Sequence, residues 1–382
     1  MIYMDNAAST KVDGKAIKAM MPYFDEVYAN PASIHNMGVS AKNALEDARR
    51  IIAKKINAEP DEIIFTSSGT ESNNLAIKGI AKELKNKKHI IMQETEHISV
   101  LNICKALEKE GFNLTILKVD KEGFIDLKQL ERAITKNTML VSIMHANNEI
   151  GTIQDIKEIG RICKKKGIYF HTDAVQSFCK EKIDAKKMNI DLMSLSSHKV
   201  HGPKGAAALY VKKGTKISSI MNGGSQEYSL RPSTENVSGI VGFAKAVALF
   251  NENYNRKIKA LRDHAINRIL NEIGDARLNG PRKSRLNNNI SLSFKNLNGE
   301  TILKHLNARG IYVSTGTACL TGSYEASHVL NAIKAHPAYI KGTIRVSLSR
   351  FTTKKEIDSF IEILKDTIQN MHRIDLKKRF IC

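Results

Sequence analysis

Residues 168–176, Ile-Tyr-Phe-His-Thr-Asp-Ala-Val-Gln, and residues 192–199, Leu-Met-Ser-Leu-Ser-Ser-His-Lys, show the pattern that decides the fold. Each stretch begins as a short strand-like run and ends in polar side chains. Similar strand-like runs lie at 63–65, 89–92, 114–119, 140–144 and 206–211, and helix-like patterns, such as the one over 41–56, separate most of them. Strands that alternate with amphipathic helices form parallel sheets buried on both faces. The sequence therefore predicts an α/β domain.

The pattern changes after about residue 255. Thr353 and Glu356 form a capping box that predicts the start of a last helix. Before it we expect a long charged helix over 252–273, a helix over 300–309 and strands at 289–294, 311–314 and 343–348. These elements predict a large domain over 14–255 and a smaller α+β domain formed by 1–13 and 256–382.

The chain has 382 residues and a formal net charge of +20, from 59 Lys and Arg against 39 Asp and Glu. Such a charge raises nucleic acid or a membrane surface as ligands. The basic runs are short and scattered, however, and aromatic residues make up only 6%, so solvated surface lysines explain the charge more simply. No apolar run of about 18 residues occurs, so we expect no membrane span. No secretory signal is visible at the N-terminus.

Five cysteines stand at 104, 163, 179, 319 and 382, with no CxxC pair. A zinc site has no support, and the thiols are expected to be reduced in a cytoplasmic protein. Cys104 and Cys163 lie in apolar helical patterns and are expected in the core. Cys319 instead lies in a stretch of small polar residues over about 315–330, a composition that favours an exposed, mobile loop.

Polar side chains follow the strands where ligands bind in such sheets. The nucleotide motifs GxGxxG and GxxxxGK[ST] are absent. An isolated Asp after a strand is more often a helix cap, and an isolated Lys is more often a surface residue. Asp173, Lys199 and the 68–70 turn together favour another interpretation. Pyridoxal phosphate needs a Schiff-base Lys, an Asp for its pyridine nitrogen and small donors for its phosphate.

At this point the chain resembles the cysteine desulfurases, a group of class V, fold-type I pyridoxal-phosphate enzymes. The matching stretches follow the family's order at 3–8, 30–33, 65–74, 95–97, 147–151, 171–176, 196–199, 314–319 and 344–347. The resemblance implies a large α/β domain with a mainly parallel seven-stranded sheet, plus a smaller α+β C-terminal domain.

The resemblance also implies a role for each matching residue. Lys199 would hold pyridoxal 5'-phosphate, Asp173 would pair with the pyridinium nitrogen, and Gln176 would donate to the ring oxygen. His97 would stack on the ring and move protons, and Arg345 would clamp the substrate carboxylate. The remaining cofactor contacts would come from Gly69, Thr70, Ser196 and His198 at the phosphate and from Asn148 near the ring oxygen and substrate.

Thr234 is expected to reach the partner subunit's phosphate in a homodimer. Residues 231–234 read Arg-Pro-Ser-Thr, where the family usually has Arg-Ser-Gly-Thr. Pro and Ser change the backbone freedom before Thr234, so this stretch departs from the family's pattern at the expected contact.

Cys319 indicates the reaction, because a plain aminotransferase needs no such thiol. The resemblance implies that its thiolate takes sulfur from L-cysteine, releasing alanine and leaving a Cys319 persulfide. An iron–sulfur scaffold protein or a tRNA-thiolating enzyme would then accept the sulfur, and Cys319 could transiently ligate a cluster. The alternatives are a selenocysteine lyase, another class V aminotransferase, and a non-enzymatic sulfur-binding or nucleic-acid-associated adapter. The complete set of Lys199, Asp173 and His97 argues against the adapter.

Overall fold

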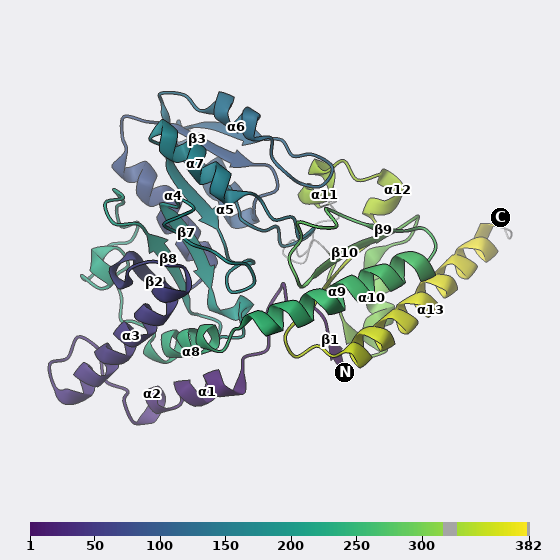
Figure 1. The fold of residues 1–382 in the computed structure, drawn as a ribbon, viewed down its shortest axis with the longest axis horizontal. Coiled ribbons are helices and arrows are strands. Elements are labelled where there is room, and N and C mark those ends of the chain that lie inside the picture. Colours follow the sequence, from purple (N-terminus) through teal and green to yellow (C-terminus); the bar gives the residue numbers. More distant parts are fainter. Residues whose placement is uncertain (316–326, 380–382) are drawn as a thin grey trace.

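The computed structural model describes the backbone of residues 1–315 and 327–379, and side chains in these ranges up to residue 373. A seven-stranded sheet forms the centre of the larger part of the molecule (Figure 1). Its order is β2 (Ile63–Thr66), β8 (Ala207–Val211), β7 (Leu192–Ser196), β6 (Tyr169–Asp173), β5 (Thr138–Ser142), β3 (His89–Gln93) and β4 (Asn113–Leu117). Only β8 pairs antiparallel with its neighbours. The predicted mainly parallel, seven-stranded sheet is confirmed.

Helices cover both faces of this sheet, as its apolar strands require. Apolar side chains of α3 (Asn36–Lys55), α7 (Ile156–Lys166) and α8 (Val237–Ala248) share one core with the sheet. Those of α4 (Gly69–Glu83) and α5 (Ile98–Lys109) share another. The shorter α1 (Gly14–Met20), α2 (Pro22–Asp25) and α6 (Leu127–Ala133) complete this part. Helix α3 begins before residue 41 because the His35 ring accepts a hydrogen bond from Gly38 N.

A separate hydrophobic core lies under the C-terminal elements. Its antiparallel sheet has the order β12 (Thr343–Ser347), β10 (Asn289–Phe294) and β9 (Ala276–Leu278). The long helices α9 (Glu252–Glu272) and α13 (Lys354–Arg379) run side by side across it (Figure 1), with α10 (Gly299–Ala308) packed on α13. The predicted capping box is present, since Glu356 N donates to Thr353 Oγ1 and Thr353 N donates to Glu356 Oε2.

The first residues join this second core. Strand β1 (Ile2–Tyr3) pairs parallel with β11 (Ile311–Tyr312), and Met4 is fully buried in the core. The predicted domain boundary at residue 255 falls within the first turn of helix α9, which runs on without a break. No change in secondary structure marks this boundary, and it stays a prediction.

Three details differ from the sequence prediction. Strand β11 ends at Tyr312, and Ser314 forms only an isolated bridge with Arg345. Helix α11 (His328–Ala332), followed by α12 (Pro337–Ile340), begins inside the range predicted as loop, because Ser327 caps it. Strand β9 was not predicted, since three partly exposed residues carry too little pattern. Within the described residues, no helix has the length and hydropathy to cross a membrane.

Candidate active site

A cavity of about 310 Å³ lies where the parallel strands β6 and β7 end and α4 begins. It collects almost all residues that the sequence pointed to. Its walls include Gly69, Thr70, His97, Asn148, Asp173, Gln176, Ser196, His198, Lys199 and Arg345. Thr234 is exposed and does not line it, and Cys319 lies outside the described residues.

Asp173 is the last residue of β6 rather than a residue beyond the strand. Its Oδ1 accepts from Val175 N at 2.9 Å and its Oδ2 accepts from Asn73 Nδ2 at 2.9 Å. The carboxylate is 5% exposed, yet it caps no long helix. Since each carboxylate oxygen has two acceptor positions, Asp173 can still accept a hydrogen bond from a group in the cavity.

A short chain of hydrogen bonds links Asp173 to His97. Asn73 Nδ2 also donates to Ser99 Oγ at 2.9 Å, and Ser99 Oγ lies 2.8 Å from His97 Nδ1. The backbone N–H of Ser99 donates to the same Nδ1. His97 Nδ1 is therefore an acceptor, and the neutral ring carries its proton on Nε2. Burial and, to a lesser extent, the nearby charge of Lys199 lower the pKa of His97, while the charge of Asp173 raises it. The net shift is downward, so the ring is neutral at pH 7.

Lys199 lies in a single 3-10 turn, Ser197–Lys199, directly after β7. Its ammonium donates to Ala7 O and Ala8 O, each at 2.7 Å. Gln176 Nε2 donates to the same Ala7 O at 2.9 Å. The N-terminal segment therefore forms one wall of the cavity and holds two of the predicted cofactor ligands.

The start of α4 supplies an anion-binding end. Ser68 Oγ accepts from Glu71 N, while the N–H groups of Gly69 and Thr70 lie in the first turn, where a helix provides no internal partner. A Cβ on Gly69 would lie 2.7 Å from Val175 Cγ2, so only glycine allows this close approach. Burial and the adjacent Lys199 lower the pKa of His198 to about 4.

Arg345 projects from β12, the C-terminal sheet, and is 3% exposed. Its NH1 donates to Asn148 O at 3.2 Å and its NH2 pairs with Asp5 Oδ1 at 3.0 Å. Its buried Nε has no hydrogen-bond partner among the described residues. A guanidinium with an unused donor suits a carboxylate ligand.

The described cysteines are unsuited to nucleophilic chemistry. Cys104, Cys163 and Cys179 are at most 3% exposed, and burial raises the pKa of each thiol to about 12. The core positions predicted for Cys104 and Cys163 are confirmed. A reactive thiol is needed as thiolate, so these three are excluded.

Sequence reasoning assigned no role to Asn73, Ser99, Val175 or the carbonyls of Ala7 and Ala8. All five residues line the cavity. Asn73, Val175, Ala7 and Ala8 lie within stretches that matched the family, which was the available signal. Ser99 lies two residues beyond one, and backbone carbonyls leave no trace in a sequence.

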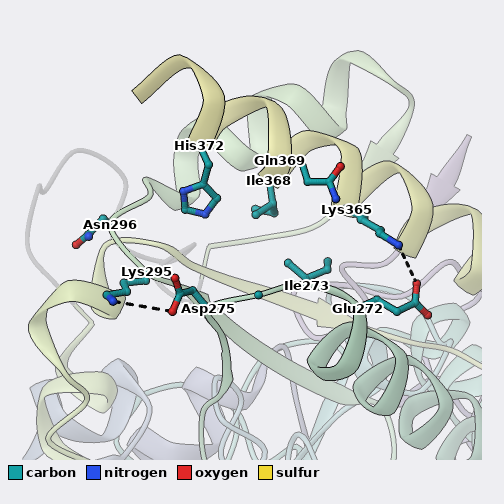
Figure 2. A pocket seen from close by; sticks show the side chains of 10 residues that line it. Glu272, Ile273, Asp275, Lys295, Asn296, Lys365, Ile368, Gln369 and His372 are labelled. Carbon is teal, nitrogen blue, oxygen red and sulfur yellow. Dashed lines mark ion pairs between the residues drawn. The ribbon is translucent and has the colours of Figure 1, made fainter. Parts of the chain in front are cut away.

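A second cavity, of about 390 Å³, lies among the C-terminal elements and contains none of the predicted site residues. Figure 2 shows its charges arranged as two pairs, Lys295 with Asp275 and Lys365 with Glu272, on either side of Ile273 and Ile368. Its charges thus largely compensate each other, and the chemistry-bearing residues lie in the first cavity.

The chain matches the model of the class-V aminotransferase family over residues 2–360. It is 47% identical over 382 residues to the cysteine desulfurase IscS of Dictyoglomus turgidum, covering 99% of this chain and 97% of that one. It is 48% identical over 377 residues to the cysteine desulfurase IscS of Methanosarcina thermophila, covering 98% and 93%.

Solved structures agree. A NifS-like protein superposes with a TM-score of 0.91 at 38% identity, covering 96% of this chain and 99% of that one. The structure of SspA in complex with cysteine superposes with a TM-score of 0.83 at 40% identity, covering 92% and 100%.

Proposed function

The chain belongs to the class-V aminotransferase family and is a cysteine desulfurase, and from that premise we propose how its own residues perform the reaction. The observation that carries the proposal is the meeting of Lys199, Asp173 and Arg345 in one cavity. They are a primary amine, a buried carboxylate and a guanidinium with an unused donor. This set can hold an aldehyde cofactor and an amino-acid carboxylate together.

The cavity fits pyridoxal 5'-phosphate by the chemistry of its donors. Lys199 would hold the aldehyde carbon and Asp173 the pyridinium nitrogen. Gln176 Nε2 gives one hydrogen to Ala7 O at 2.9 Å and would donate its second hydrogen to the ring oxygen. Gly69, Thr70, Ser196 and His198 would bind the phosphate at the start of α4, where helix geometry favours an anion. When bound, the cofactor supplies an electron sink for bonds at the substrate Cα and Cβ.

The substrate carboxylate would bind Arg345, with Asn148 beside it. Asp5 already pairs with Arg345 NH2 at 3.0 Å and Asn148 O accepts from NH1, so the guanidinium is oriented before substrate arrives. Preorganised donors of this kind lower the barrier because they need not rearrange during reaction.

The reaction balances within the enzyme and its substrate. L-cysteine and the Cys319 thiol give L-alanine and a Cys319 persulfide. A sulfur–sulfur bond forms, and the carbon–sulfur bond of the substrate breaks. The electron pair of that bond remains on carbon, which takes up a proton, so carbon is reduced and sulfur oxidised. Lys199 and neutral His97 are the groups placed to move protons in the cavity.

A homodimer is part of the proposal. Thr234 is exposed on this chain, which suits a contact with the partner's cofactor. Helices α1 to α3 and the segments between them also present large apolar side chains to solvent: Ile17, Met21, Phe24, Tyr28, Ile34 and Val39 are 44–97% exposed. Apolar side chains gathered in one stretch of surface mark an interface more often than open surface.

An iron–sulfur scaffold protein or a tRNA-thiolating enzyme remains the proposed acceptor of the persulfide sulfur. The cytoplasm is the proposed location, and the three described cysteines, all free thiols, support reducing surroundings.

The decisive experiment compares Cys319→Ala with Cys382→Ala, since neither thiol belongs to the buried set. Cys319→Ala should retain the visible absorbance of the Lys199-bound cofactor and lose alanine formation from L-cysteine, whereas Cys382→Ala should retain both. Mass spectrometry after one turnover should place an added sulfur atom on Cys319. Wild-type turnover by Cys319→Ala would show that this assignment of the nucleophile is wrong.

A further inference from the structure

The start of α11 is bonded to two of the turns that carry predicted active-site residues, those of His97 and Asn148. Ser327 Oγ donates to Glu149 Oε2 at 2.5 Å, and Glu149 follows Asn148 in the chain. His328 Nε2 lies 3.0 Å from Glu96 O, and Glu96 precedes His97. A carbonyl oxygen can only accept, so His328 Nε2 carries the proton and donates. Two neighbouring residues of α11 therefore reach the His97 turn and the Asn148 turn.

The Ser327 hydroxyl is used fully. Besides donating to Glu149, its oxygen accepts from Val329 N at 3.1 Å and Leu330 N at 3.2 Å, so it is also the N-cap of α11. Ser327 is 2% exposed and Glu149 is 7% exposed. If Glu149 lost this donor, its buried side chain would carry the full free-energy penalty of desolvation. Breaking the hydrogen bond with Ser327 is therefore unfavourable.

Apolar packing strengthens the same junction. Ile150, next to Glu149, forms a small core with Val329, Leu330 and Ile333 of the α11 region. Helix α11 is therefore held on the large part of the molecule by two hydrogen bonds and by a buried apolar contact.

Glu149 also connects this junction to the substrate clamp. Burial raises its pKa to about 7, while the Ser327 hydrogen bond and the charge of Arg345 act in the opposite direction. Arg345 is close enough to act on Glu149 and bonds the carbonyl of Asn148, the preceding residue. One carboxylate thus lies between the proposed carboxylate clamp and the start of α11.

We propose that Ser327 and Glu149 are positioning residues for sulfur transfer. Their hydrogen bond fixes the chain eight residues after Cys319 against the turns that hold His97 and Arg345. This inference rests on the proposed function, because it assumes that Cys319 receives sulfur from a substrate held by Arg345. Neither residue is placed on the substrate; each acts through the groups that it holds.

The test uses the holoenzyme with Ser327→Ala, Ser327→Thr and a matched control, Thr353→Ala. The control also removes a hydroxyl helix cap, at α13, which contacts neither turn. Ser327→Ala should lower kcat for alanine formation on the order of 10–100-fold, the usual cost of a small misplacement at a reacting centre. L-alanine, titrated through the cofactor spectrum, should bind within about twofold of wild type. Ser327→Thr, which keeps the hydroxyl, should recover most of kcat, and Thr353→Ala should leave it unchanged.

The outcomes separate this inference from the proposed function. An unchanged kcat in Ser327→Ala overturns the positioning role, as does a loss of kcat matched by an equal loss in Thr353→Ala. If Ser327→Ala does not fold, Glu149→Met provides the same test, because it keeps a side chain of similar length and removes the oxygen that accepts from Ser327 Oγ; wild-type kcat there also overturns the proposal. Turnover by Cys319→Ala in the same assay would instead refute the proposed nucleophile.

Discussion

Asn73 is the residue whose replacement most directly tests the electrostatics of the site. It is 1% exposed, and its Nδ2 donates to both Asp173 Oδ2 and Ser99 Oγ at 2.9 Å. Asn73→Ala removes one of the two donors that the Asp173 carboxylate has among the described residues, and it also releases the hydroxyl that bonds His97 Nδ1. A hydrogen bond to a charged group contributes about 1.5–3 kcal/mol. If that energy supports the transition state, kcat falls about 10–150-fold.

Asn73→Asp provides a sharper prediction. It replaces the donor by a second carboxylate about 3 Å from Asp173, where two like charges cannot both remain ionised. The two carboxylates would then share one proton, which weakens the negative charge that Asp173 offers to a pyridinium nitrogen. Asn73→Asp should therefore lose more activity than Asn73→Ala and should also release the cofactor more readily. Asn74→Ala is the matched control on the same helix, since among the described residues Asn74 Nδ2 donates to Thr70 O at 2.9 Å and to neither Asp173 nor Ser99.

The assay is alanine formation from L-cysteine at saturating substrate, with cofactor content measured on the same samples. The expected order of kcat is Asn74→Ala near wild type, then Asn73→Ala, then Asn73→Asp. Equal kcat for Asn73→Ala and Asn74→Ala would refute the role of the hydrogen-bond chain. A milder effect of Asn73→Asp than of Asn73→Ala would refute the electrostatic argument.

Two further predictions concern stability. The pKa of Glu149 is raised by burial to about 7 from an ordinary 4.5, so the stability that its proton contributes is fully present below about pH 4.5 and is lost as the pH rises to about 7. Glu149→Gln should show a smaller loss of unfolding free energy across that window in denaturant titrations; an unchanged slope would contradict the assignment. Ser233 has a φ of 95°, so Ser233→Gly should raise the unfolding free energy by about 0.5–1 kcal/mol after the entropy of glycine is counted, and a decrease would contradict this reasoning.

The sequence predicted those features that depend on local pattern or on type of side chain. The strands at 192–196 and 289–294 coincide with β7 and β10, because short runs in which apolar residues alternate with serine have the period of a strand. Lys199 and Asp173 stood out because they lie at strand ends, whereas Arg345, in the middle of β12, was predicted only from the resemblance to the family. Ser99 could not, since a serine in the first turn of a helix usually serves the helix alone.

The contact between the start of α11 and the Glu149 turn could not be predicted from the sequence, for a different reason. Small polar residues over about 315–330 favour a loop, whereas helix α11 begins at His328; residues 316–326 lie outside the described residues. What makes α11 helical there is tertiary: the Ser327 hydroxyl finds both the helix N–H groups and the Glu149 carboxylate, and Ile150 covers its apolar side. Apart from the N–H groups of the helix itself, these partners are more than 170 residues away in the sequence. A prediction from local helix propensity could not include them.

The charged and polar groups that line the cavity would by themselves favour a phosphate and a carboxylate as ligands, with no contribution from the surface charge. Burial lowers the pKa of His97 and of His198, so both rings are neutral at pH 7. Lys199 and Arg345 are then the cationic side chains of its wall, and Asp173 is the carboxylate. A phosphate would meet Lys199 and two neutral rings able to donate, whereas a substrate carboxylate would meet Arg345, whose charge is already paired with Asp5. The formal charge of +20 is not needed for that binding, because solvent screens exposed lysines beyond about 10 Å. It remains available at the surface, where it would act on the approach of an acidic sulfur acceptor.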